Sequence, residues 1–181
     1  MLNSKPAWVA VMTRPRAELK VARNFELGQP QIEYYLPMIA VRDRRRRQSD
    51  LEEKPMFPSY VFAHINNKQV YQTRTTTGVL FIVSANHSII QMTDSEIEAI
   101  RKFEATQRKF HVAETSSLVK GAKVKILSGE FAGMEGTLLR GNKDGNFSVN
   151  ISVMNMSIIT HIRRDELKPD MVEVESEMEE R

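Results

Sequence analysis

The stretch at residues 55–63 constrains the fold more than any other part of this sequence. It reads Pro-Met-Phe-Pro-Ser-Tyr-Val-Phe-Ala, so two prolines frame Phe57 and a second aromatic residue, Tyr60, opens an apolar run. Proline fixes φ at about −65° and favours extended geometry in the residue before it. An uninterrupted apolar run is typical of a central strand that is covered on both faces. We therefore expect a stiff approach to a central strand, with Phe57 and Tyr60 either held at its mouth or packed in the core.

Apolar periodicity and helix-capping signals organise the rest of the first hundred residues. Further strands are expected at 8–12, at 32–41 with an interruption at Pro37, and at 79–83. A helix is expected from Pro15, a residue that suits the first helical turn, to about Leu27. Asn66 is expected to cap a short helix. The sequence Thr-Asp-Ser-Glu at 93–96 is expected to form a capping box for a longer helix that ends at about Lys109.

The composition changes in the second half of the chain. Residues 106–117 mix polar and small side chains and are expected to form a linker. Short β-like runs separated by glycine-rich turns follow at 118–169, and this pattern predicts a small barrel. Residues 170–181 carry six acids and one base and are expected to be a disordered tail. The sequence therefore predicts one domain at 5–105 and a second at 118–169.

Charge is distributed unevenly along the chain. Taking the tail's six acids and one base from the chain's 23 acids and 26 bases leaves 17 acids and 25 bases, a formal charge of +8 on residues 1–169. A basic body of this kind is typical of proteins that bind nucleic acid. Arginine occupies five of the six positions at 42–47. We expect Arg44, Arg45, Arg46 and Arg47 to bind phosphate at a hairpin tip without reading base sequence, with a merely solvated tip as the alternative.

The residue pattern offers no catalytic centre. The four histidines, His64, His87, His111 and His161, are scattered without metal-ligand spacing. The sequence has no nucleophile motif, P-loop or dinucleotide fingerprint. It also lacks cysteine and any apolar run of membrane-spanning length, which favours a cytoplasmic protein. We expect a protein that acts by binding, without enzymatic activity, metal or other cofactor.

Four motifs in register carry a family resemblance. They are the segment from Trp8 to Glu18, the stretch at 55–63, the run Arg-Thr-Thr-Thr-Gly-Val-Leu-Phe-Ile-Val at 74–83, and the glycine-containing segment at 120–136. In this order they resemble the NusG family of transcription elongation factors over residues 8–168. The Thr-Arg-Pro-Arg-Ala-Glu sequence at 13–18 and the arginine run are most similar to the specialised UpxY-type antiterminators of polysaccharide operons. The resemblance implies an α+β fold: an N-terminal α/β sandwich with a mainly antiparallel sheet, followed by a small all-β SH3-like barrel of the KOW type.

The resemblance also implies three contact sites in the first domain. Phe57 and Tyr60 match an apolar patch that binds the clamp helices of the largest RNA polymerase subunit. The element that faces the gate loop of the other large subunit matches Tyr71, Thr73, Thr75, Thr76 and Thr77. The residues that match a contact with the non-template DNA strand are Arg14, Arg16, Lys20 and Arg23, for which ordinary exposed charge is the alternative.

The second domain departs from the general family pattern. In the general factor the barrel binds a small-subunit ribosomal protein or termination factor Rho, and the segment before its last strand carries Phe-Gly-Arg. This chain has Met154-Asn155-Met156 there, and Glu130 where proline is expected before Phe131. The resemblance therefore implies a partner surface at Phe131, Met154 and Met156. The departures from the general pattern argue against Rho as the partner, and a small-subunit ribosomal protein stays a candidate.

The function expected from the sequence is transcription antitermination. The chain would be a monomer that binds RNA polymerase and non-template DNA or leader RNA, and suppresses pausing and termination on a particular long operon. One alternative is a general NusG-type factor that couples polymerase to Rho or the ribosome. A second is a ribosome-associated RNA-binding KOW protein, which leaves residues 5–105 unexplained.

Overall fold

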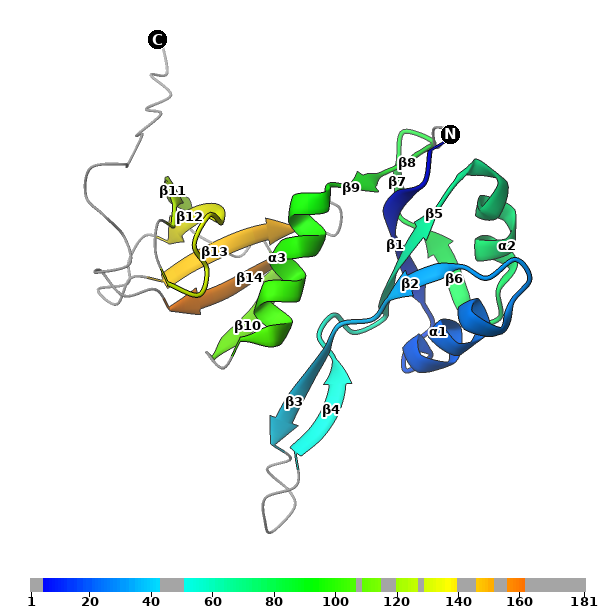
Figure 1. Cartoon of the computed structure of the whole chain (residues 1–181), viewed down its shortest axis with the longest axis horizontal. Helices are drawn as coiled ribbons and strands as arrows, with labels where there is room; N and C mark the ends of the chain where they lie inside the picture. The colour runs from blue at the N-terminus through cyan, green and yellow to red at the C-terminus, as the bar shows by residue number, and fades with distance from the viewer. Residues whose placement is uncertain are drawn as a thin grey trace. The chain divides into compact units, whose positions relative to one another are not determined.

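The structure is a computed structural model that describes residues 5–42, 51–106, 109–114, 120–126, 129–139, 146–151 and 156–161. The chain divides into two compact units, Met1–Glu104 and Ala105–Arg181. Figure 1 labels their helices and strands. Among the described residues, no helix has the length and apolar character needed to cross a membrane.

Unit 1 is built on an antiparallel sheet with strand order β2-β5-β1-β6, and β9 pairs with the other end of β1. Its strands are β1 (Ala7–Thr13), β2 (Glu33–Tyr35), β5 (Tyr60–Ile65), β6 (Val79–Ile82) and β9 (Gln91–Met92). Two hairpins complete the unit, one formed by β3 (Met38–Arg42) and β4 (Leu51–Pro55) and the other by β7 (Ser84–Ala85) and β8 (Ser88–Ile89). The β3–β4 hairpin extends away from the sheet (Figure 1).

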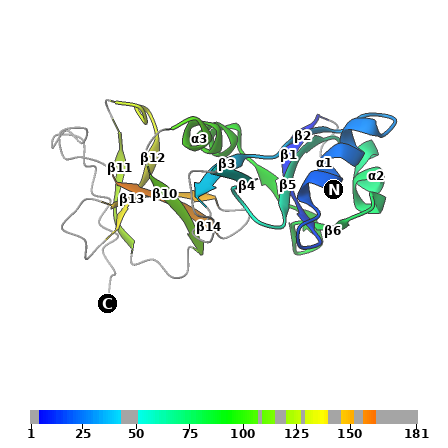
Figure 2. The same cartoon turned by 90° about the horizontal axis from the view of Figure 1, so that it is seen from below.

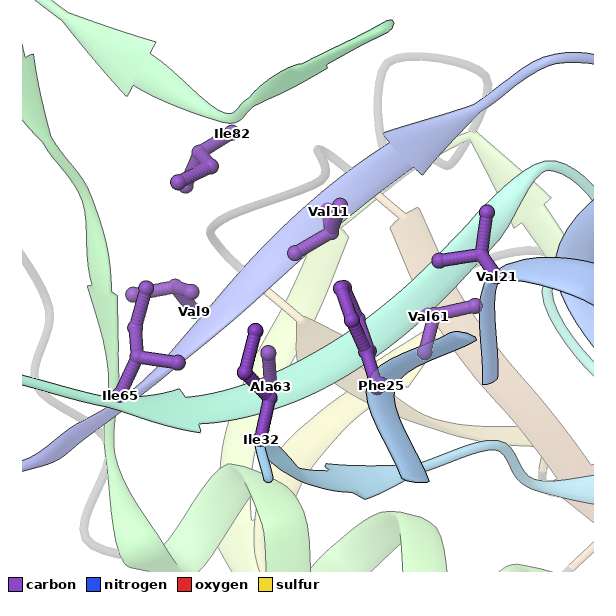
Figure 3. Packing of buried hydrophobic residues seen from close by; sticks show 9 residues of the cluster. All are labelled: Val9, Val11, Val21, Phe25, Ile32, Val61, Ala63, Ile65 and Ile82. Carbon is purple, nitrogen blue, oxygen red and sulfur yellow. The ribbon is translucent and has the colours of Figure 1, made fainter. Parts of the chain in front are cut away.

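The central strand β5 is covered on both faces, as the apolar run at its start predicts. On one face, side chains of α1 (Glu18–Leu27) pack on β1, β5 and β6 in a cluster that Figure 3 shows. This core cluster consists of Val9, Val11, Val21, Phe25, Ile32, Val61, Ala63, Ile65 and Ile82. On the opposite face Trp8, Ala10 and Phe62 are buried as well. The alternation of side chains along a strand places these two sets on opposite sides of one sheet.

Helices cover the two sides of this sheet. Figure 2 shows α1 and α2 (Val70–Thr75) on one side of β1, β2 and β5, and α3 (Asp94–Ala105) on the other. The α3 capping box is confirmed, because the Glu96 N–H donates to Thr93 Oγ1 (3.2 Å) and the Thr93 N–H donates to Glu96 Oε2 (2.9 Å). The Asn66 cap is confirmed as well, in front of the 3-10 helix η1 (Asn67–Gln69) that leads into α2.

Two predicted helix boundaries are wrong. The first helix begins at Glu18 and not at Pro15, because Arg16 has φ 62°, a left-handed conformation that no α-helix includes. The helix α3 ends at Ala105 instead of continuing to about Lys109. The break at Pro37, by contrast, separates β2 from β3 as the sequence predicts.

Unit 2 contains a five-stranded antiparallel sheet with the order β10-β14-β13-β12-β11. Its strands are β10 (Phe110–Glu114), β11 (Lys120–Lys125), β12 (Glu135–Leu139), β13 (Asn146–Ile151) and β14 (Met156–His161). The predicted linker at 106–117 is therefore wrong at 110–114, where β10 pairs in register with β14. The tail at 170–181 lies outside the described residues.

Candidate functional site

The segment 56–60 between β4 and β5, here called the aromatic loop, carries the two predicted polymerase contacts. Phe57 is 1% exposed and packs edge-to-face on Phe62 of β5, with ring centroids 5.6 Å apart at 77°. The Met56 N–H donates to the Pro37 carbonyl oxygen (2.8 Å), which ties the loop to the start of the β3–β4 hairpin. Phe57 is thus a core residue in this structure, and the prediction that its ring lies at a contact surface needs correction.

Tyr60 is half-buried and lies in a row of apolar side chains that crosses three strands. It pairs in register with Met12 of β1, which in turn pairs with Phe81 of β6. Directly paired residues of antiparallel strands point to the same face, and this face is opposite the one that holds Val11, Val61 and Ile82. Phe81 is 50% exposed. We call Tyr60, Met12 and Phe81 the apolar row.

Phe81 and Met12 were not identified as site residues from the sequence. Phe81 sits inside the apolar run at 79–83, where every residue suits a strand. Only the strand register reveals that it is opposite Met12 and faces the same way as Tyr60. A large aromatic side chain that is half exposed on a sheet face is the kind of feature that marks an interaction surface.

The threonine-rich element folds into α2 and the turn after it. Three of its hydroxyls donate to backbone carbonyl oxygens four residues earlier in the chain: Thr73 to Gln69 (2.8 Å), Thr75 to Tyr71 (3.0 Å) and Thr76 to Gln72 (2.8 Å). Thr73 is fully buried. The protons of these three hydroxyls are therefore engaged within the element itself. Tyr71, which is 78% exposed, Thr75 and Thr77 are the exposed members of the predicted gate-loop set.

The turn after α2 is held against α1. The Asn24 side-chain amide donates to the Thr77 carbonyl oxygen (3.1 Å), and the Arg14 N–H donates to the Gly78 carbonyl oxygen (2.9 Å). Gly78 has φ +101°, and a Cβ atom there would lie 2.9 Å from Val21 Cγ2 of α1. Only glycine satisfies both requirements, so this position fixes the close approach of the threonine-rich element to α1.

The predicted nucleic-acid residues fall into two groups. Arg14, Arg16, Lys20 and Arg23 are all exposed, on α1 and in the turn that precedes it. Within the described segments none of these four side chains is paired with an acid. Arg44, Arg45, Arg46 and Arg47 lie outside the described residues, in the connection between β3 and β4.

The base of the β3–β4 hairpin is fastened to α3 by Glu104. Its carboxylate accepts a hydrogen bond from the Tyr35 hydroxyl (2.6 Å) and one from the Met38 N–H (2.7 Å). The Arg101 guanidinium lies over the Tyr35 ring, 5.2 Å from its centroid. Burial, followed by the hydrogen bond to Glu104, raises the pKa of Tyr35 well above its ordinary value of 10.0.

This shift predicts a dependence of stability on alkaline pH. The unfolded chain loses the Tyr35 proton near pH 10, whereas the folded chain keeps it, so the contribution is full below about pH 10 and is lost as pH rises further. Between about pH 9 and about pH 11 the wild type should lose more free energy of unfolding than Tyr35→Phe. The difference between the two losses should be less than about 1.4 kcal/mol, because solvent screens this half-buried group. Urea unfolding at the two pH values measures the difference, and equal losses in both proteins would contradict it.

The predicted partner surface of unit 2 is only partly described. Phe131 is 1% exposed in the turn between Gly129 and Gly133, so its ring belongs to the core of the unit, contrary to the prediction of a surface role. Met156 is half-buried at the start of β14, and Met154 lies outside the described residues.

The His64 side chain contacts two neighbouring side chains, those of Glu33 and Trp8. Its Nδ1 atom is 2.7 Å from Glu33 Oε2, and its ring stacks on Trp8 with centroids 4.9 Å apart. In the part of the chain that the structure describes, no three His, Cys, Asp or Glu side chains gather in a way that could hold a metal ion.

Comparison with known proteins places these features in a family. The family model described as transcription termination factor NusG matches residues 6–101, a range that begins before β1 and ends within α3. This chain belongs to the NusG family. The NusG match contains the apolar row, the threonine-rich element and all four exposed basic residues of the α1 region.

One solved structure supports the NusG assignment at the level of fold. A structure of NusG from Thermotoga maritima that concerns its domain interaction matches with a TM-score of 0.53 and 21% identity, covering 91% of this chain and 97% of that one. The MjSpt4:Spt5 complex in conformation A matches with a TM-score of 0.33 and 16% identity over 89% of this chain and 96% of that one, too low a score to support an argument. No curated protein sequence matches the chain. Members of the NusG family are transcription factors without enzymatic activity.

Proposed function

We propose that this chain is a transcription elongation factor that binds RNA polymerase through the apolar row and suppresses pausing and termination. The observation that supports this most is the position of Tyr60, Met12 and Phe81, side by side across three strands on one face of a NusG-family domain. Apolar and aromatic side chains that are partly exposed on a rigid sheet are suited to receive helices of a partner. The clamp helices of the polymerase are the partner that we assign to this row.

The proposed effect on pausing is a shift between polymerase states. Tyr71 and Thr77 lie at the threonine-rich element, which we assign to the gate loop on the opposite side of the cleft. A protein that contacts both sides binds the closed clamp better than the open one and thereby raises the population of the closed state. A preference of about 1.4 kcal/mol shifts that equilibrium tenfold.

The basic surface of α1 is assigned to the exposed non-template strand. Lys20→Gln combined with Arg23→Gln should weaken binding of single-stranded DNA and lower the slope of log affinity against log salt. Each lost phosphate contact contributes about 0.7 to that slope, so the double variant should lose about 1.4. Fluorescence anisotropy with a labelled oligonucleotide at several salt concentrations measures the slope.

The control for this prediction removes one positive charge outside the α1 region. Lys68 is exposed on η1. Lys68→Gln should leave the salt slope unchanged. A double variant whose slope equals that of the wild type would rule out Lys20 and Arg23 as phosphate contacts.

The operon-specific role is the finer part of the proposal. We assign unit 2 to an SH3-like KOW barrel, and its five antiparallel strands in one sheet are consistent with that assignment. The sequence Met154-Asn155-Met156 and Glu130 depart from the pattern of the general factor, which favours antitermination without Rho. A monomer in the cytoplasm fits this role, with a ribosomal protein as a further candidate partner.

A pull-down from bacterial lysate tests the proposed function. RNA polymerase retained without Rho would support a polymerase-bound antiterminator. Recovery of both would favour the general factor. Ribosomes or ribosomal RNA recovered in place of polymerase would overturn the proposal in favour of a ribosome-associated protein.

A further inference from the structure

Glu18 is a buried carboxylate next to the aromatic loop. It is the first residue of α1 and is 6% exposed, whereas the other charged side chains of α1 point to solvent. Its Oε1 atom accepts a hydrogen bond from the Ser59 N–H at 2.6 Å. Burial of a carboxylate costs free energy unless hydrogen bonds compensate it. The hydrogen bond from the Ser59 N–H therefore offsets part of the cost of burying Glu18.

Hydrogen bonds to both its N–H and its carbonyl oxygen hold Ser59 in a strained backbone conformation. Its φ is 65°, in the left-handed region that side-chain-bearing residues rarely adopt. The Glu18 carboxylate holds its N–H, and the Thr13 N–H donates to its carbonyl oxygen (2.8 Å). The next residue is Tyr60, whose own N–H donates to the Phe57 carbonyl oxygen (3.2 Å). The direction in which the chain enters β5 at Tyr60 therefore depends on the backbone of Ser59.

From this geometry we infer that Glu18 is a positioning residue for polymerase binding: it holds Ser59 in its left-handed conformation and so presents Tyr60 within the apolar row. Only the predicted effect on polymerase binding rests on the proposed function; the predicted effect on the conformation of Ser59 does not. Glu18 also belongs to the helix that carries Lys20 and Arg23. This hydrogen bond therefore links the helix with the basic face directly to the loop that precedes Tyr60.

The test compares Glu18→Ala, Glu18→Gln and the double variant Glu18→Ala with Ser59→Gly. Glu18→Ala should reduce affinity for purified RNA polymerase about tenfold, since it removes a charge-assisted hydrogen bond that orders the loop. Glu18→Gln keeps an acceptor oxygen and should lose less. Glycine adopts positive φ without strain, so Ser59→Gly should restore part of the affinity that Glu18→Ala loses.

A readout without polymerase separates this inference from the proposed function. In Glu18→Ala the Ser59 amide should lose its protection from hydrogen exchange, and the ring signals of Tyr60 should shift, while amides of Val9 and Val61 in the core stay protected. If Glu18→Ala does not fold, the same comparison is made with Glu18→Gln. Unchanged Ser59 protection and unchanged Tyr60 signals would overturn the inference. Failure of the wild type to bind polymerase would instead overturn the proposed function, and the exchange data would still decide the role of Glu18.

Discussion

Phe57→Ala is expected to destabilise unit 1 by about 3–5 kcal/mol, the usual cost of removing a buried phenylalanine side chain. The ring is 1% exposed and packs edge-to-face on Phe62, so alanine would leave a cavity beside the central strand. The chain has one tryptophan, Trp8, and it lies on β1 of the same unit. Trp8 fluorescence during urea unfolding therefore reports on this unit.

Tyr60→Ala is the matched comparison for this prediction. Tyr60 is half-buried, so its replacement should cost clearly less stability than Phe57→Ala. If Phe57→Ala left the unfolding midpoint unchanged and instead abolished polymerase binding, Phe57 would be a direct contact and its assignment to the core would be wrong.

The second large effect concerns binding. Tyr60→Ser combined with Phe81→Ser should weaken the affinity for RNA polymerase by more than about tenfold, because burying a large apolar side chain typically contributes about 1.5–3 kcal/mol. Both side chains are partly exposed in the free protein, so the unfolding midpoint should change little. Biolayer interferometry with immobilised polymerase measures the affinity.

Leu27→Ser provides the control for this variant. Leu27 is 68% exposed at the end of α1, and α1 packs on the face of the sheet opposite the apolar row. A general loss of surface hydrophobicity would weaken binding in Leu27→Ser as well. Equal loss in the two variants would contradict a specific role for the row.

Local signals in the sequence predict much of unit 1. The apolar run after Tyr60 predicts a strand covered on both faces, and the capping residues Asn66 and Thr93 predict helix starts, because each of these features depends on neighbouring residues. The family resemblance is confirmed by the match over residues 6–101.

Features that depend on distant residues could not be predicted in the same way. The two prolines around Phe57 indicate a stiff loop, but the side to which the ring points follows from its contact with Phe62. The strand β10 gains its hydrogen bonds from β14, more than forty residues later, so the short polar segment around it resembles a linker. The register that joins Tyr60, Met12 and Phe81 is likewise a property of three separate strands.

The most direct test of the account is an equilibrium titration of purified RNA polymerase with the full chain carrying a fluorescent label. Polymerase binding through the apolar row predicts saturable binding that Tyr60→Ser with Phe81→Ser weakens by more than about tenfold and that Leu27→Ser leaves unchanged. Absence of binding by the wild type, or the same affinity for the wild type and the double variant, would contradict it.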